Sequence, residues 1–136
     1  MIQQVSVFIV NRTGTLNEVL GILKEAQIQL YAISVADTAD YGICRLICDR
    51  PEDALQALVV KGVAAAVSPV CAVELDNTPG AAADMVALFA KEGLSLAYLY
   101  TFLYENRPIM IFRTDDADKA RNILQASGLC CFNWNE

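Results

Sequence analysis

The chain has 136 residues, of which 55% are hydrophobic, and a formal net charge of −6. Its ten Lys and Arg residues are scattered singly and form no basic cluster, so we expect no nucleic-acid partner. No apolar run reaches the length of about 18 residues that a membrane span needs, so the mean hydropathy of +0.37 indicates an apolar domain or subunit interface instead.

The cysteines and the first residues indicate a cytoplasmic protein. The opening Met1–Val5 lacks the basic segment and cleavage site of a secretory signal. Five cysteines are an odd number, which suits small buried hydrophobes better than a disulfide framework. The chain has no His and no Cys-x-x-Cys spacing, so we expect no metal, no cofactor and no catalytic set, and we expect that the protein is not an enzyme.

The first half of the chain predicts the order β-α-β-β-α-β. Apolar residues alternate over residues 4–11, which predicts a strand that ends in a turn at Gly14. Residues 15–27 have apolar spacings of three and four, which predicts a helix, and Thr15 and Glu18 have the spacing of a capping box. The remaining predicted elements are strands over 28–37 and 43–48, a helix capped by Asp49 that ends at Gly62, and a short strand over 63–67.

The second half repeats this pattern at an offset of 66 residues, which places Asn77 on Asn11 and Gly80 on Gly14. Its predicted elements are strands over 70–76, 94–104, 109–114 and 130–134, and helices over 81–92 and 116–127. Each half therefore predicts a four-stranded antiparallel sheet with both helices on one face, which is an α+β fold. Because only Ser68-Pro69 separates the halves, we expect two closely tethered domains, residues 1–67 and 68–136.

The turns over residues 11–15 and 77–81 are the candidate ligand sites. Glycine lets a ligand approach the main chain, and the free amides at the start of the following helix suit a carboxylate. The Asn side chain adds a donor and an acceptor beside them. One such turn is equally explained as a structural turn, but two at matching places favour paired small-molecule sites.

At these residues the chain resembles the ACT domain family, the small regulatory modules of amino-acid metabolism. Two tandem copies cover nearly the whole chain, and the resemblance is carried by the two Asn-x-x-Gly turns and by the segments Ala26–Leu30 and Glu92–Leu96. It implies a ferredoxin-like βαββαβ fold, repeated twice, whose sheets pair side by side with the helices on one face. It also implies that free amino acids bind where the first turn of one module meets the start of strand two of its neighbour.

Carried over residue by residue, the resemblance implies that the first turn faces Ser95 and the second turn faces Gln29. Both residues stand where the family has Asn. The ligand-binding residues that it implies are Asn11, Arg12, Thr13, Gly14, Thr15, Gln29, Asn77, Thr78, Pro79, Gly80, Ala81 and Ser95.

Two departures from the family pattern bear on the ligand. Serine-binding members carry a His two residues before the turn Asn, and here Ile9 and Leu75 hold those places, which argues against serine. Arg12 either pairs with a ligand carboxylate or is a solvated surface residue. The matching residue of the second copy is Thr78, which has no charge, and this favours the solvated residue.

An aromatic row is the second candidate functional feature. Tyr98, Tyr100, Phe102 and Tyr104 alternate along the second strand of the second half, so they lie on one side of it. With the helices on the opposite face, this row lies on the open face of the sheet. A protein–protein interface, packing within the chain and a ring-stacking ligand surface are the three interpretations.

The sequence therefore predicts a regulatory sensor that binds an amino acid between its two repeats. We expect it to form a homodimer and to act allosterically on a regulated enzyme. The alternative is an interaction protein without a ligand, which acts through the aromatic open face of the second repeat.

Overall fold

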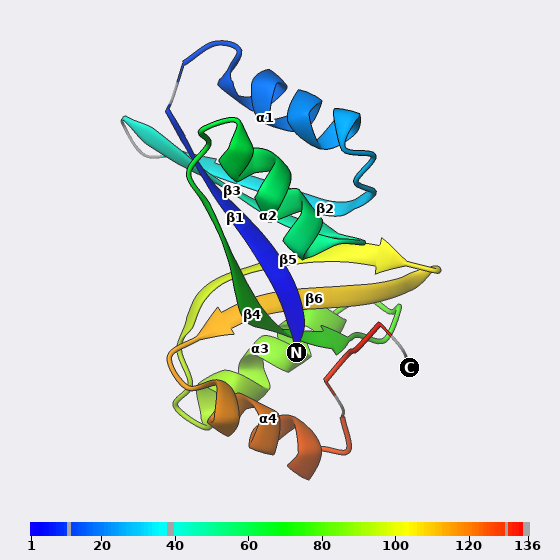
Figure 1. Ribbon diagram of the computed structural model, residues 1–136. Helices are drawn as coiled ribbons and strands as arrows, with labels where there is room; N and C mark the ends of the chain where they lie inside the picture. The colour runs from blue at the N-terminus through cyan, green and yellow to red at the C-terminus, as the bar shows by residue number, and fades with distance from the viewer. Residues whose placement is uncertain (11, 38–39, 130, 135–136) are drawn as a thin grey trace. The chain divides into compact units, whose positions relative to one another are not determined.

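The computed structural model describes residues 1–10, 12–37, 40–129 and 131–134 (Figure 1). The chain divides into two compact units, which we call the first unit, Gln3–Pro69, and the second unit, Met1–Ile2 with Val70–Glu136. Each unit is an antiparallel sheet with two helices, which confirms the predicted ferredoxin-like α+β fold.

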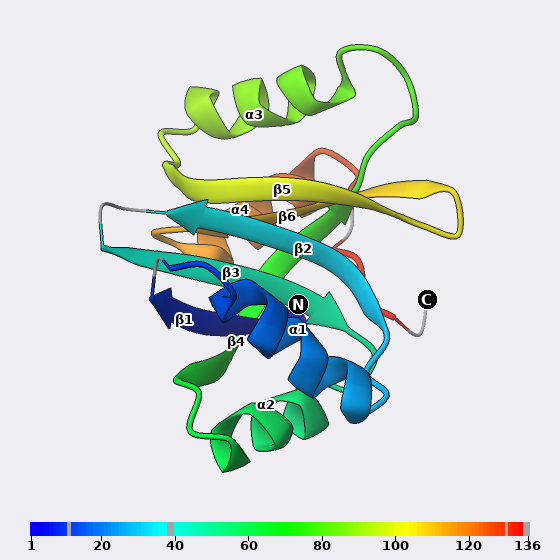
Figure 2. The same ribbon diagram turned by 90° about the horizontal axis from the view of Figure 1, so that it is seen from above.

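The first unit has its strands in the order β2-β3-β1-β4. Its elements are β1 (Ile2–Val10), α1 (Thr15–Glu25), β2 (Leu30–Asp37), β3 (Tyr41–Cys48), α2 (Pro51–Val60) and the first part of β4 (Ala65–Glu74). Val5 of β1 pairs with Leu46 of β3, and Val7 pairs with Cys44. Figure 2 shows α1 and α2 on the same side of β1, β2 and β3.

The core of the first unit lies between this sheet and its two helices. The residues that β1 and β3 turn toward the helices are buried, and the stripe of Val19 and Leu23 on α1 packs on them with Ala54 and Leu58 on α2. Alternation in the strands and helical spacing in the helices thus meet at one layer, as binary patterning requires. Cys44 and Cys48 are part of this core, as predicted.

The second unit repeats the arrangement. Its elements are the second part of β4, α3 (Ala81–Lys91), β5 (Leu96–Tyr104), β6 (Arg107–Thr114) and α4 (Ala117–Ala126), with strand order β4-β6-β5. Figure 1 shows α3 and α4 together on one side of β6. In the core, the rings of Phe89 on α3 and Phe112 on β6 lie 4.9 Å apart between centroids.

The backbone repeats at the offset of 66 residues. Gly14 and Gly80 both have a left-handed backbone, with φ of 92° and 88°. Gln27 and Gly93, which also match at this offset, have φ of 58° and 72°. The internal repeat seen in the sequence is therefore a repeat of local conformation as well.

Two predicted strand boundaries are wrong. The strands expected over 63–67 and 70–76 are one continuous strand, β4, which runs through Pro69. Proline fixes φ at a value that an extended chain accepts and also holds the preceding residue extended, so it does not end the strand. The strand expected over 130–134 is reduced to a bridge between Val73 and Cys131, with Phe132 N donating to Ala72 O at 2.7 Å; Cys130 lies outside the described residues.

Candidate functional site

The first candidate turn leads into α1. Gly14 is the N-cap residue, with φ 92° and ψ −13°, and no side chain caps the helix at this end. Arg12, Thr13 and Gly14 are exposed, and Asn11 lies outside the described residues. Thr15 N donates to Arg12 O at 3.4 Å, and no side chain caps the amides that follow it in the first turn.

The predicted capping box at this turn is wrong. Because Gly14 takes the N-cap position, Thr15 is the first helical residue, and Glu18 N donates to Gly14 O at 3.0 Å. Thr15 Oγ1 is buried and has no hydrogen-bond partner among the described residues. The start of α1 thus holds one unsatisfied polar atom within the candidate site.

The second candidate turn has the same geometry. Gly80 is the N-cap residue of α3, with φ 88° and ψ −4°, and again no side chain caps the helix. Ala81 N donates to Thr78 O at 3.3 Å, which closes the turn. Asn77, Thr78, Pro79 and Gly80 are exposed, and Ala81 is half-buried.

A pocket of about 350 Å³ lies beside the second turn, within the second unit. Leu75 and Met85, both nearly buried, form part of an apolar floor. Asp76 and Asp84 also line the pocket, and none of the described residues that line it is basic. Its remaining lining residues are Glu74, Thr78, Ala81, Leu88, Ser127 and Leu129. The pocket thus combines an apolar floor with negative charge, which suits a small molecule that carries an ammonium group.

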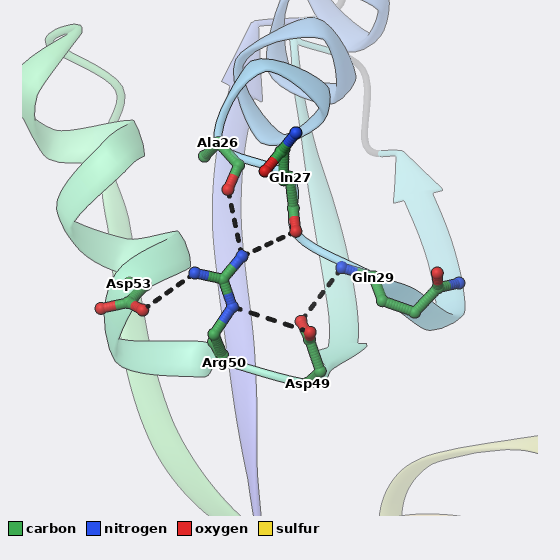
Figure 3. Close-up of polar contacts among 6 residues, drawn as sticks. All are labelled: Ala26, Gln27, Gln29, Asp49, Arg50 and Asp53. Atoms are coloured by element: carbon green, nitrogen blue, oxygen red, sulfur yellow. Dashed lines mark hydrogen bonds and ion pairs between the residues drawn. The ribbon is translucent and has the colours of Figure 1, made fainter.

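Gln29, in the first unit, is held by a cluster of polar contacts at the start of β2 (Figure 3). Gln29 N donates to Asp49 Oδ1 at 3.0 Å, and Asp49 N donates to Gln29 O at 3.1 Å. Asp49 therefore does not cap α2 as predicted, because its carboxylate is bonded to the backbone of Gln29; Arg50 occupies the N-cap position instead.

Arg50 ties the end of α1 to the start of α2. Its Nη2 donates to Ala26 O at 3.1 Å and to Gln27 O at 2.6 Å, and its Nη1 pairs with Asp53 Oδ2 at 3.2 Å. Its Nε lies 3.6 Å from Asp49 Oδ2 (Figure 3). We call Asp49 and Arg50, with the segment 26–29 that they hold, the Arg50 clasp. It satisfies carbonyls that the end of α1 would otherwise leave open.

A second pocket, of about 490 Å³, lies next to the clasp within the first unit. Lys24, Gln27 and Gln29 supply its polar lining, and Leu23 and Ile28 are its buried apolar residues. Leu20 and Leu30 complete it. Gln29 thus lines a pocket, whereas the exposed Ser95, its counterpart in the second unit, lines none of the described pockets.

The aromatic row lies on the face of its sheet away from the helices. Tyr100 is opposite Ile111 and Phe102 is opposite Ile109, whereas Leu99 is opposite the core residue Phe112. Tyr98 and Tyr100 stack with centroids 6.4 Å apart. The row therefore lies on the side of its sheet away from the helices, where its partners Ile109 and Ile111 are buried. The use of this face in a protein contact stays a prediction.

Three residues of this face were missed from the sequence. The Trp134 ring lies 4.9 Å from that of Tyr104 and 6.3 Å from that of Phe102, and Phe132 packs against both Tyr104 and Trp134. The guanidinium of Arg107 lies over the rings of Tyr104 and Phe132. The spacing of two between Phe132 and Trp134 places both on one side of an extended segment, and this signal could have found them.

Comparison with known proteins identifies the family. The model of the ACT domain pair matches residues 1–132. The chain belongs to the ACT domain family. The match confirms the resemblance, and it indicates a pair of regulatory-type domains. Among curated proteins, no match was found.

Solved structures share the fold of this ACT domain pair. Protein BT0572 from Bacteroides thetaiotaomicron is 31% identical, with a TM-score of 0.87 over 96% of this chain and 90% of that one. The ligand-free regulatory subunit of aspartate kinase from Thermus thermophilus is 21% identical, with a TM-score of 0.65 over 92% and 91%. The corresponding subunit from Thermus flavus is 24% identical, with a TM-score of 0.63 over 93% and 90%.

The part of the chain that the structure describes contains neither a candidate membrane span nor a candidate metal cluster. No helix there is both long and apolar enough to cross a membrane. No group of three or more His, Cys, Asp or Glu residues is placed to hold a metal ion in that part.

Proposed function

We propose that this ACT domain pair is a regulatory protein that binds a free amino acid and passes the signal to an enzyme. Its family is one of regulatory-type domains, and the fold is shared with regulatory subunits of aspartate kinases. The observation that carries the proposal is the pair of uncapped helix starts behind Gly14 and Gly80, at matching places in the two copies.

The chemistry of these helix starts suits an amino acid. Free amides and the helix dipole attract a carboxylate at the start of α3. Asp76 and Asp84 line the pocket at the same turn and suit an ammonium group. A free amino acid carries both groups on adjacent atoms, and the apolar floor of Leu75 and Met85 suits its side chain.

The location of the ligand is also part of the proposal. Following the family pattern, we place the ligand where the turn of one ACT module meets the start of strand two of a neighbouring module. Asn77 and Gly80 would then act with Gln29, and Asn11 and Gly14 with Ser95. The side chain of each Asn would supply one donor and one acceptor beside the helix amides.

A thermal-shift screen against the common amino acids tests the binding proposal. A ligand at about 100 times its Kd adds roughly 2.7 kcal/mol of stability, which is easily measured. We expect at least one amino acid to raise the Tm of the wild type and to lose this effect with Asn77→Ala. Asn122→Ala, an exposed change on α4, is the matched control and should keep the effect. The proposal fails if no amino acid raises the Tm.

The edge strands support the proposal of a homodimer. In the first unit β2 is an edge strand, and its Ile33 and Val35 are 46% and 47% exposed. In the second unit β5 is an edge strand that contains no charged residue and no proline, and its Leu103 is 66% exposed. Unprotected apolar edges of this kind pair readily with another strand, and a second copy of the chain offers one.

A second candidate function is supported by the aromatic face. Tyr98 and Tyr100 stack side by side and are half-buried, and rings with polar tips are typical of protein interfaces. In this alternative the protein binds a partner through β5 and needs no ligand. Tyr98→Ala with Tyr100→Ala should then alter the oligomeric or partner-bound state, while no amino acid changes the Tm of the wild type.

A further inference from the structure

The two copies differ in how strand two begins. In the first copy, Asp49 exchanges two backbone-directed hydrogen bonds with Gln29, and Arg50 bonds the carbonyls of Ala26 and Gln27 (Figure 3). Asp49 therefore holds the backbone of Gln29, and Arg50 holds the residues that precede it. A segment held in this way enters a complex with little further loss of conformational freedom.

The second copy has different residues at these places. Asp116 stands where the first copy has Arg50, and its carboxylate accepts from Lys119 N at 3.0 Å, so it caps α4. Asp115 stands where the first copy has Asp49, and its Oδ1 accepts from the hydroxyl of Thr114 at 3.1 Å. The carboxylates that could have held Ser95 are therefore used elsewhere.

The backbone of Gln27 indicates that the clasp serves more than the fold. Gln27 has a left-handed φ of 58°, which a residue with a side chain resists, while the matching residue of the second copy is Gly93. A glycine would relieve this strain. The strain is retained at a residue that lines the same pocket as Gln29, and such strain is typical of functional sites.

We propose that Asp49 and Arg50 are positioning residues that fix Gln29 for ligand binding, so that the site containing Gln29 binds more tightly than the site containing Ser95. This inference rests on the proposed function and adds to it an order between the two sites. Neither Asp49 nor Arg50 needs to touch the ligand, because each acts through the backbone of the segment 26–29.

Amide hydrogen exchange tests the positioning without any ligand. Gln29 N–H should exchange slowly and Ser95 N–H quickly in the wild type, because only Gln29 N–H is bonded to a carboxylate. Asp49→Ala should speed the exchange of Gln29 N–H toward that of Ser95, and Asp49→Asn, which keeps an acceptor oxygen, should restore part of the protection. Equal exchange at Gln29 and Ser95 in the wild type would overturn the inference.

Ligand titration tests the order of the two sites. The probe is whichever common amino acid raises the Tm of the wild type most. We expect Asp49→Ala and Arg50→Ala each to weaken its binding by about tenfold, because a segment that is no longer held must lose conformational freedom when the ligand binds. Asp115→Ala is the matched control in the second copy and should leave the affinity within about twofold.

The outcomes separate the two proposals. If an amino acid binds the wild type and both clasp variants equally, the positioning role is wrong and the proposed function stands. If no amino acid binds the wild type, the proposed function fails and the order of the two sites fails with it, and slow exchange of Gln29 N–H would then show only that Asp49 holds this backbone. Arg50→Lys keeps the charge but cannot reach several acceptors at once, so it should recover little of the affinity.

Discussion

The glycines of the two candidate turns are required by backbone conformation rather than by space. A Cβ added at Gly80 meets no atom within 4 Å, yet φ is 88°. Gly80→Ala should therefore destabilise the fold by about 1 kcal/mol through left-handed strain alone. It should also shift the first turn of α3 and so weaken the response to an amino acid. Urea unfolding measures the first effect, and thermal shift measures the second.

Gly21 offers the matched control. It lies in α1, where an added Cβ also meets no atom within 4 Å, but its backbone is helical. Gly21→Ala should stabilise the fold by about 0.5–1 kcal/mol, because alanine is the better helix former. If both substitutions changed the free energy of unfolding in the same direction, backbone strain would not be the reason for glycine at position 80.

The buried cysteines give the stability a pH dependence. Burial raises the pKa of Cys44, and it is the main cause of the raised pKa of Cys48 and Cys71, from an ordinary value of 9.0. The folded thiols therefore stay protonated where those of the unfolded chain ionise. Their contribution to the free energy of unfolding is complete below pH 9.0 and is lost as the pH rises toward the raised values.

Urea unfolding between pH 7 and about 10 measures this loss. Cys44→Val replaces a fully buried thiol with an apolar side chain and should reduce the decline in stability with pH. The account is contradicted if the variant and the wild type lose stability equally over this range.

The Arg50 clasp joins two helices and should contribute more to the free energy of unfolding than a surface ion pair does. Arg50→Ala removes charged hydrogen bonds to two carbonyls of the segment that ends α1, and we expect a loss of about 2 kcal/mol. Arg121→Ala removes a single pair with Asp118 on α4, whose carboxylate side chain is 87% exposed, and should cost at most about 0.5 kcal/mol. Urea unfolding of both variants measures the difference, and equal losses would show that the clasp adds nothing.

The element order could be predicted because each element has a clear period and most ends have a marker. Apolar spacing placed the helices, and Gly62 and Gly128, which follow α2 and α4, both have a left-handed backbone. The boundary at Pro69 was wrong because proline is compatible with the extended chain of β4. The last strand was predicted too long, since register with Val73 is a tertiary property that local pattern does not contain.

The site could be predicted only in part. The turn glycines could be predicted because a left-handed backbone favours glycine, and both Gly14 and Gly80 have that backbone. Asp49 and Arg50 look like ordinary helix-start residues, and their contacts with Gln29 and Gln27 cross 20 to 23 positions of the chain. The clasp therefore becomes visible only in the structure.

At the scale of the whole molecule, the exposed edge of β2 predicts the oligomeric state. Val35 points to the helix side of this edge strand and is 47% exposed. Val35→Lys should prevent pairing of the edge with a second copy and convert a dimer into a monomer. Sedimentation velocity measures this change, with Val60→Lys, an exposed change on α2, as the control that should stay dimeric. A monomeric wild type would contradict the prediction.

An amino acid that binds at the uncapped start of a helix in this ACT domain pair should change the environment of the amides there. An NMR titration of ¹⁵N-labelled protein with the amino acid that most raises the Tm tests it most directly. We expect the amide signals of Gly80, Ala82 and Ala83 to shift with a saturable dependence on ligand, together with that of Gln29. Saturable binding that leaves these amides unmoved, or no binding by any amino acid, would contradict the account.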